Sequence, residues 1–146
     1  MSACAPSGSS PAEPDTAVVE TDTFDANTLQ ALLIDVEEGG TVELPAGTIE
    51  VVNGLSLDVN AVTLRGAGQD QTILDFSGQT GAGEGLLITS DDVIIEGFTI
   101  RDTKGDGIKS KGADRITYRD LTIEWTGGPD ENNGAYGVYP VESTDV

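Results

Sequence analysis

The residues of this chain that suggest chemistry most directly are two lysines, Lys109 and Lys111. They stand two positions apart in a segment where apolar and polar residues alternate, so their side chains are predicted to leave a β-strand on the same face. Tyr139 follows at the equivalent place of a similar segment. A pair of amines beside an aromatic ring can bind an anionic sugar, because the amines pair with the carboxylate and the ring stacks on the sugar. The simpler alternative is that the two lysines keep the surface of a strand soluble.

The loop 129–134 is the second region with suggestive side chains. Asp130, Glu131 and Asn132 carry oxygen atoms, which are the ligands that calcium prefers. The loop lacks the ligand spacing of a defined calcium-binding loop. No other cofactor is evident, so calcium at these three residues is the cofactor hypothesis that the sequence supports.

Aspartates also recur at one place in the repeating part of the chain, as Asp91, Asp92, Asp114 and Asp145. Aspartate side chains at a recurring turn usually hydrogen-bond their own backbone, and we expect this role here. Calcium binding is the alternative.

Three aromatic residues, Trp125, Tyr136 and Tyr139, lie close in sequence to the loop 129–134. They can form a stacking platform for sugar rings. The commoner role of such residues is to pack beneath a long loop, and both interpretations stay open at this point.

The charge of the chain limits the classes of partner. Its 146 residues include 26 acidic and 7 basic side chains, for a net charge of −19. Such a surface repels phosphate backbones and anionic headgroups, so we expect no nucleic-acid partner and no direct docking on a membrane. The chain contains no histidine, which excludes His-based triads, most catalytic zinc sites and His-ligated haem within it. A general role of the charge in solubility remains the plainest explanation.

Residues 1–23 are predicted to form a disordered linker, since residues 1–20 are rich in Ser, Pro, Ala and Glu and show no apolar period. Cys4 follows Ser2 and Ala3, which resembles the end of a bacterial lipoprotein signal, where small residues precede a lipidated cysteine. The resemblance implies a lipid anchor on Cys4 as the membrane contact. It also implies an extracytoplasmic place in a bacterium: periplasmic, anchored to the outer membrane or secreted. The charged and apolar regions of such a signal are missing before Cys4, and a surface thiol without this role is the alternative.

The segment 25–40 is predicted to contain one amphipathic helix. Its apolar stripe consists of Leu29, Leu32, Leu33 and Val36. Asp25 or Asn27 can cap its start, and Gly39-Gly40 are predicted to end it. Because the rest of the chain is predicted to form strands, this helix is expected to cover the open end of a sheet structure, as terminal caps do in solenoids.

From residue 41 onward one pattern recurs, in which a glycine and an aliphatic residue are followed by a Val or Ile run. The glycines are Gly54, Gly85, Gly107 and Gly137, and the runs begin at Val62, Val93, Ile116 and Val146. The runs are 31, 23 and 30 residues apart, and the longer intervals contain the Gly-rich segments 77–84 and 126–133. We therefore predict a coil of about 23 residues with a variable loop at one corner.

A repeat of three short strands that cannot bury its own face predicts a parallel β-helix, in which equivalent residues of neighbouring coils stack in columns. The predicted inward columns are Leu55, Leu86, Ile108 and Val138; Val62, Val93, Ile116 and Val146; Phe98 and Leu121; and Ile100 and Ile123. The predicted outward columns are Arg65, Glu96 and Arg119; Arg101 and Glu124; Ser56, Leu87, Lys109 and Tyr139; and Asp58, Thr89, Lys111 and Val141. Two of the outward columns bring opposite charges together, which supports this alignment independently.

These features resemble the start of bacterial secreted proteins of the pectin-lyase-like superfamily. The likeness covers about residues 24–146 and is carried by the helix followed by segment 40–49, and by segments 62–68 and 72–75. It implies an all-β fold, a right-handed parallel β-helix with an N-terminal capping α-helix. The chain is also similar to envelope proteins with parallel β-helix repeats, which are often lipoproteins. In the lyases of the superfamily, an Arg or Lys abstracts a proton next to a uronate carboxylate that calcium or acid-binding groups neutralise.

Three hypotheses for function follow. The leading one is an extracytoplasmic carbohydrate-active protein that binds or cleaves an acidic polysaccharide by lyase or epimerase chemistry. Val146 would open another inward strand, so we expect further coils after it and the active site beyond residue 146. The rival is a non-catalytic binding or scaffold protein of the envelope that docks a protein partner. The third is a truncated product without a function of its own.

Overall fold

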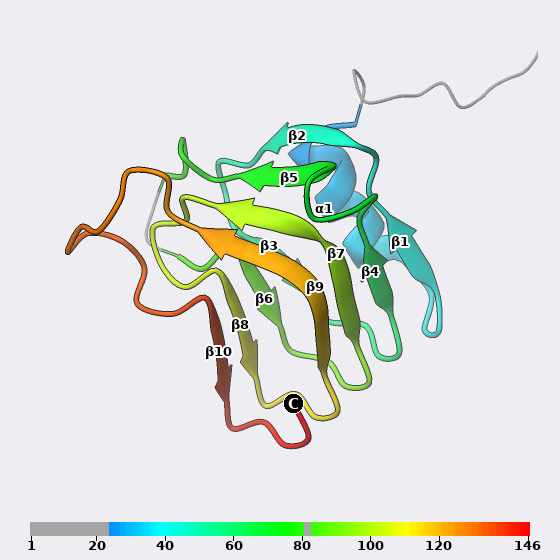
Figure 1. Cartoon of the computed structure of the whole chain (residues 1–146). Coiled ribbons are helices and arrows are strands. Elements are labelled where there is room, and N and C mark those ends of the chain that lie inside the picture. The colour runs from blue at the N-terminus through cyan, green and yellow to red at the C-terminus, as the bar shows by residue number, and fades with distance from the viewer. Residues whose placement is uncertain (1–23, 81–82) are drawn as a thin grey trace, which may run out of the picture.

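The computed structural model describes residues 24–80 and 83–146, and in these residues the fold is mostly β, with one helix and two parallel sheets (Figure 1). This coarse part of the predicted fold class is confirmed. The elements in chain order are α1 (Ala26–Asp35), β1 (Thr41–Glu43), β2 (Gly47–Glu50), β3 (Leu55–Leu57), β4 (Thr63–Arg65), β5 (Thr72–Asp75), β6 (Leu86–Ile88), β7 (Ile94–Arg101), β8 (Ile108–Lys111), β9 (Thr117–Glu124) and β10 (Val138–Val141).

The strands pair with strands from other passes of the chain and not with their sequence neighbours. One sheet has the order β1-β4-β7-β5-β2, with β9 also paired to β7, and the other has the order β10-β8-β6-β3. Strand β7 pairs with β4 through residues 94–96 and with β5 through residues 99–101, and the sheet curls between these two parts (Figure 1). Gly97 lies at the bend with a φ of +81°, a conformation that glycine adopts without steric cost.

Helix α1 begins as predicted and ends earlier than predicted. The Asp25 side chain accepts a hydrogen bond of 2.9 Å from the backbone N–H of Thr28, and this bond lowers the pKa of Asp25. The helix ends at Asp35, because Val36 already has an extended backbone, so the prediction that Gly39-Gly40 end it is wrong. Gly40 instead donates a hydrogen bond of 2.8 Å to the carbonyl of Glu37, in the turn that leads into β1.

The buried stripe of α1 is narrower than the sequence predicts. Leu29 and Leu33 are fully buried, whereas Leu32 is 40% exposed, so its prediction as a core residue is wrong. Gln30 explains how the helix still closes the edge of β3: its Oε1 accepts from the N–H of Ser56 at 2.9 Å, and its Nε2 donates to the carbonyl of Ser56 at 3.1 Å. The side-chain amide thus satisfies the backbone groups that a neighbouring strand would satisfy, which protects an exposed strand edge.

The interior follows the predicted columns. Leu55 pairs with Leu86, Leu86 with Ile108, and Ile108 with Val138. Leu55, Leu86 and Ile108 are buried. The partners Phe98 and Leu121, and Ile100 and Ile123, are also in the predicted register. Val62, Val93 and Ile116 are buried, and Val146, the last residue of the chain, is 54% exposed.

A column of glycines explains why the repeat begins with this residue. A Cβ atom at Gly85 would lie 2.7 Å from the carbonyl oxygen of Gly107, and one at Gly107 would lie 2.7 Å from that of Gly137. A Cβ at Gly54 would lie 3.0 Å from the carbonyl oxygen of Glu84. The successive passes therefore approach so closely at this corner that a side chain does not fit.

The two predicted charge columns are present on the outside of the curled sheet. Glu96 receives a hydrogen bond from Arg65 Nε at 2.8 Å and from Arg119 Nε at 2.9 Å. Arg101 Nε lies 3.7 Å from an Oε atom of Glu124. Parallel register thus places one carboxylate between two guanidinium groups, which lowers the pKa of Glu96 and raises that of Arg65.

Acidification is expected to weaken the Glu96 column. Because hydrogen bonds from Arg65 and Arg119 hold the pKa of Glu96 below its ordinary value of 4.5, its carboxylate adds stability above that value and loses the contribution as the pH falls through the folded-state pKa. The free energy of unfolding, measured by urea titration, should decrease from about pH 5 to about pH 3. Replacement by the neutral Glu96→Gln should cost about 1 kcal/mol at neutral pH and flatten part of this dependence.

Glu131→Gln is the control for this experiment, because Glu131 is exposed and forms no ion pair with the described residues. It should keep the pH profile of the unaltered chain. An identical profile for Glu96→Gln would show that Glu96 contributes nothing to the acid sensitivity.

Candidate functional site

The structure brings the predicted sugar-binding residues onto one sheet face. Lys109 and Lys111 belong to β8, and in the register of the parallel pair Tyr139 of β10 lies beside Lys109 while Val141 lies beside Lys111. We call Lys109, Lys111, Tyr136 and Tyr139 the lysine–tyrosine strip. Ile108, which precedes Lys109, and Ser110, which lies between the two lysines, are buried. Because side chains alternate along a strand, both lysines of β8 therefore point outward.

The centre of the strip is a contact between a cation and an aromatic ring. Lys109 Nζ lies 5.8 Å from the centroid of the Tyr139 ring, within the range of a cation–π interaction. Tyr139 stacks on Tyr136 with a centroid distance of 4.5 Å and an interplanar angle of 16°. Tyr139 is 36% exposed and Tyr136 is 49% exposed, so the stacked pair keeps accessible surface.

The two lysines differ in their partners. Lys109 Nζ lies 4.0 Å from Oε2 of Glu84, at the limit of an ion pair, so part of its charge is balanced within the chain. Lys111 is exposed and forms no ion pair with any described residue. Further along its column, Thr89 Oγ1 donates to Asp58 Oδ1 at 2.8 Å, which engages the hydroxyl and the carboxylate with each other. Lys111 is therefore the more available cation of the strip.

A shallow hollow adjoins the strip on the side of β3. It is lined by Gly54, Leu55, Ser56, Gly83, Glu84 and Leu87. Leu87 pairs with Lys109 in the sheet, and Glu84 contacts Lys109, so the hollow and the strip form one continuous surface. Glu84 was not predicted as part of the site, because it lies in a Gly-rich loop whose position only the folded chain determines.

Among the described residues, Trp125 makes no ring contact with the tyrosine pair. Its indole Nε1 donates a hydrogen bond of 2.8 Å to the carbonyl of Thr103, and its ring is only partly exposed. A Cβ at Gly134 would lie 2.9 Å from the indole ring, so the loop backbone packs directly on it. Of the two interpretations of the aromatic residues, the sugar platform thus fits the tyrosines and packing beneath the loop fits Trp125.

The predicted calcium ligands stabilise their own loop. Asp130 Oδ1 accepts a hydrogen bond of 2.8 Å from the N–H of Asn132 and one of 2.9 Å from its Nδ2. Within residues 24–80 and 83–146, no group of three or more His, Cys, Asp or Glu side chains is placed to hold a metal ion. Calcium binding by Asp130, Glu131 and Asn132 stays a prediction.

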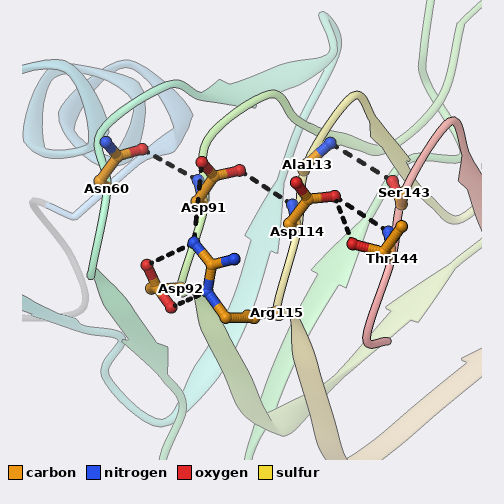
Figure 2. A network of polar contacts seen from close by, with 8 residues as sticks. All are labelled: Asn60, Asp91, Asp92, Ala113, Asp114, Arg115, Ser143 and Thr144. Carbon is orange, nitrogen blue, oxygen red and sulfur yellow. Dashed lines mark hydrogen bonds and ion pairs between the residues drawn. The ribbon is translucent and has the colours of Figure 1, made fainter.

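The recurring aspartates form a ladder between passes of the chain (Figure 2). Asn60 Oδ1 accepts from the N–H of Asp91, Asp91 Oδ1 accepts from the N–H of Asp114, and both bonds are 2.9 Å long. Asp114 Oδ1 then accepts from the N–H and the hydroxyl of Thr144, at 3.0 and 2.9 Å. The prediction that these side chains bond their own backbone is wrong for Asp91 and Asp114, whose carboxylates accept from the equivalent turn of the next pass. Asn60 was missed, although it precedes Val62 as Asp91 precedes Val93.

Asp92 and Arg115 complete the same corner (Figure 2). Arg115 donates from Nε to Asp92 Oδ1 at 2.6 Å and from its terminal nitrogen to Oδ2 at 3.1 Å, and this lowers the pKa of Asp92. Both residues have a φ of +60°, as does Ala61, and Asp145 follows with +55°. The left-handed conformation recurs at this turn in successive passes. The carboxylates of Asp91, Asp92 and Asp114 are hydrogen-bonded to the equivalent turn of the next pass.

Cys4 lies outside the described residues. No helix in the part of the chain that the structure describes has the length and apolar character required to span a membrane. With the fold and the strip described, the chain is defined as a mostly β protein of parallel sheets that presents a cationic and aromatic strip. Comparison of the chain with models of protein families, with curated proteins and with solved structures gave no match.

Proposed function

We propose that this chain is part of a right-handed parallel β-helix protein of the pectin-lyase-like kind, which binds an acidic polysaccharide outside the bacterial cytoplasm. The parallel pairing of successive passes and the stacked columns at Leu55, Leu86 and Ile108 support the solenoid. A lipid anchor on Cys4 belongs to the same proposal, as does calcium as the neutralising ion at the loop 129–134.

The lysine–tyrosine strip carries the proposal for function. Tyr136 and Tyr139 form a partly exposed stacked pair, and an outer ring face of such a pair can stack on a sugar ring. Lys111 supplies an amine for a uronate carboxylate, and Lys109 supplies a second amine held against Tyr139. One face of the sheet therefore offers an aromatic ring for the sugar ring and an amine for its carboxylate.

The charge of the whole chain sets the conditions for such binding. A net charge of −19 repels a polyanion at long range, whereas the two lysines attract it locally. The screening length is about 30 Å at 0.01 M salt and about 10 Å at 0.1 M salt, so moderate salt removes the long-range repulsion before it removes the direct contacts. We expect binding to be stronger in 0.1 M than in 0.01 M salt, which is opposite to the behaviour of a basic polyanion-binding protein.

The direct test is calorimetric titration of the chain with an oligogalacturonate, and with its methyl ester as the neutral ligand. Lys111→Gln is expected to weaken binding of the acidic oligomer about fivefold, the equivalent of one exposed ion pair worth about 1 kcal/mol. The same substitution should leave binding of the ester unchanged, because the ester carries no charge.

Lys104→Gln is the matched control. Lys104 is also an exposed lysine without an ion pair among the described residues, but it lies in the connection between β7 and β8 and not on the strip. Equal losses of affinity in the two variants would mean that only net charge matters. Such a result would contradict the proposed strip.

Lyase or epimerase chemistry is proposed for residues beyond 146 of the whole protein. The rival, a non-catalytic envelope scaffold that docks a protein partner, is favoured by one observation: Lys109 already contacts Glu84, which reduces the charge available to a sugar. Failure of the folded, unaltered chain to bind acidic oligomers at moderate salt would favour the scaffold.

A further inference from the structure

The chain contains two Asn-Gly pairs, Asn53-Gly54 and Asn133-Gly134. An asparagine before a glycine is chemically labile, because the backbone nitrogen of the glycine can attack the side-chain amide carbon of the asparagine. Glycine favours this ring closure, since it has no Cβ to obstruct the approach and its backbone rotates freely. The folded structure places the two pairs in different environments.

Asn53 is free to react. It is exposed and lies in the bend between β2 and β3, outside any strand. Neither the Asn53 side chain nor the N–H of Gly54 donates a hydrogen bond to another residue that the structure describes. Leu55, the next residue, is the first held by the sheet, through its N–H to the carbonyl of Gly85 at 2.8 Å. The reacting atoms therefore precede the first hydrogen bond of β3, and a Cβ at Gly54 would contact the Glu84 carbonyl oxygen at 3.0 Å without overlapping it.

Asn133 is held in three ways. Its N–H donates to the carbonyl of Asp130 at 3.0 Å, and its Nδ2 donates to the carbonyl of Gly128 at 3.0 Å. Gly134 packs so closely on the backbone of Gly105 that an added Cβ would overlap the carbonyl oxygen of Gly105. Ring closure would require rotation of the Asn133 side chain, which would break its hydrogen bond to Gly128, and of the Gly134 backbone, which the contact with Gly105 opposes.

We propose that Asn53 is a site of spontaneous deamidation in the folded protein, and that the fold protects Asn133 from the same reaction. The Gly54 nitrogen loses its proton and forms a bond to Cγ of Asn53, the bond from Cγ to Nδ2 breaks, and the leaving NH2 group takes up one proton and departs as ammonia. Water then opens the succinimide ring at one of its two carbonyls, which yields aspartate or isoaspartate at position 53. No oxidation or reduction is involved.

The modification would change the connection to the capping helix. Asn53 and Gly54 line a small hollow together with Ala26, Asn27 and Gln30 of α1. Isoaspartate adds one methylene to the backbone between β2 and β3, three residues before Ser56, whose backbone N–H and carbonyl are hydrogen-bonded to Gln30. Either product also places a new carboxylate beside the first turn of α1, where the helix dipole favours negative charge.

Peptide mapping of the full chain after storage in mildly alkaline buffer tests the proposal. Cleavage after glutamate separates the sites into peptides 51–84 and 132–142. Each deamidation adds one mass unit, and fragmentation locates it and distinguishes isoaspartate from aspartate. We expect position 53 to convert several times faster than position 133 in the folded chain, and the two rates to become similar in concentrated urea.

Two variants sharpen the test. Asn53→Gln should suppress conversion in peptide 51–84, since the six-membered ring that glutamine must form closes far more slowly, and it should leave position 133 unchanged. Asn133→Gln should have no effect on position 53. Equal rates at the two positions in the folded chain, or faster conversion at position 133, would overturn the proposal.

Discussion

Replacing Gly85 with alanine is expected to lower the free energy of unfolding by about 3 kcal/mol, a loss at the upper end of those that follow overfilling of a closely packed site. The new Cβ would lie 2.7 Å from the carbonyl oxygen of Gly107 and 2.8 Å from Cγ2 of Thr103. The Gly107 carbonyl cannot move away without cost, because it accepts the hydrogen bond of the Leu86 N–H, at 3.0 Å. Strain at Gly85 therefore acts on the pairing of β6 with β8.

Gly127→Ala is the control for this substitution. A Cβ at Gly127 would meet no atom within 4 Å, and its φ is not in the left-handed region. Its replacement should stabilise the chain slightly, by up to about 1 kcal/mol, because alanine restricts the unfolded chain. Urea titration followed by the fluorescence of Trp125, the one tryptophan of the chain, compares the two variants. Equal effects would contradict the close approach of neighbouring passes.

Phe98→Ala is expected to cost about 3–5 kcal/mol, since it removes a fully buried aromatic side chain and leaves a cavity. Phe98 lies in β7, the strand that pairs with β4, β5 and β9, and its register partner is Leu121. The side chain therefore supports both parts of the curled sheet. A decrease of this size is a large fraction of the stability of a small domain, so partial unfolding at room temperature is an expected result.

Tyr136→Ala removes an aromatic side chain of similar size from the surface. Because Tyr136 is 49% exposed, its loss should cost no more than about 1.5 kcal/mol, the upper value of one aromatic pair contact. Circular dichroism during thermal unfolding measures both variants. If the two substitutions had the same effect on the midpoint, Phe98 would not occupy the core.

The sequence predicted strand register best at positions where the residues stacked on them in neighbouring passes allow only one type of side chain. The spacing of Gly85 and Gly107, and of Val93 and Ile116, predicted strand register, because a parallel stack repeats the same environment at each pass. The alignment of Arg65, Glu96 and Arg119 predicted an ion-pair column that the structure contains. In each case a local pattern and a long-range contact impose the same requirement.

The sequence was less informative where the choice of partner depends on distance. The Asp91 carboxylate can reach its own turn or the next one, and only the spacing of the passes selects the N–H of Asp114. Leu32 fits the apolar stripe of the helix, but it borders an open hollow together with Thr41, Val42 and Glu43 of β1 and is 40% exposed. Lys109 contacts Glu84, which lies in the loop before β6. No local sequence pattern predicts that this loop comes close to β8.

The sequence by itself determined the stacked columns of the repeat, a helix start at Asp25 or Asn27, and the placement of Lys109 and Tyr139 in one column. These features follow from periodicity, from backbone preference and from the need to bury apolar faces, all of which act on short segments or on exact repeats. Only the tertiary structure decided that Tyr136 stacks on Tyr139, that Gln30 closes the edge of β3, and that Asn53 is accessible while Asn133 is held. These outcomes depend on how closely separate passes approach, and that distance is set by the sum of all contacts in the stack.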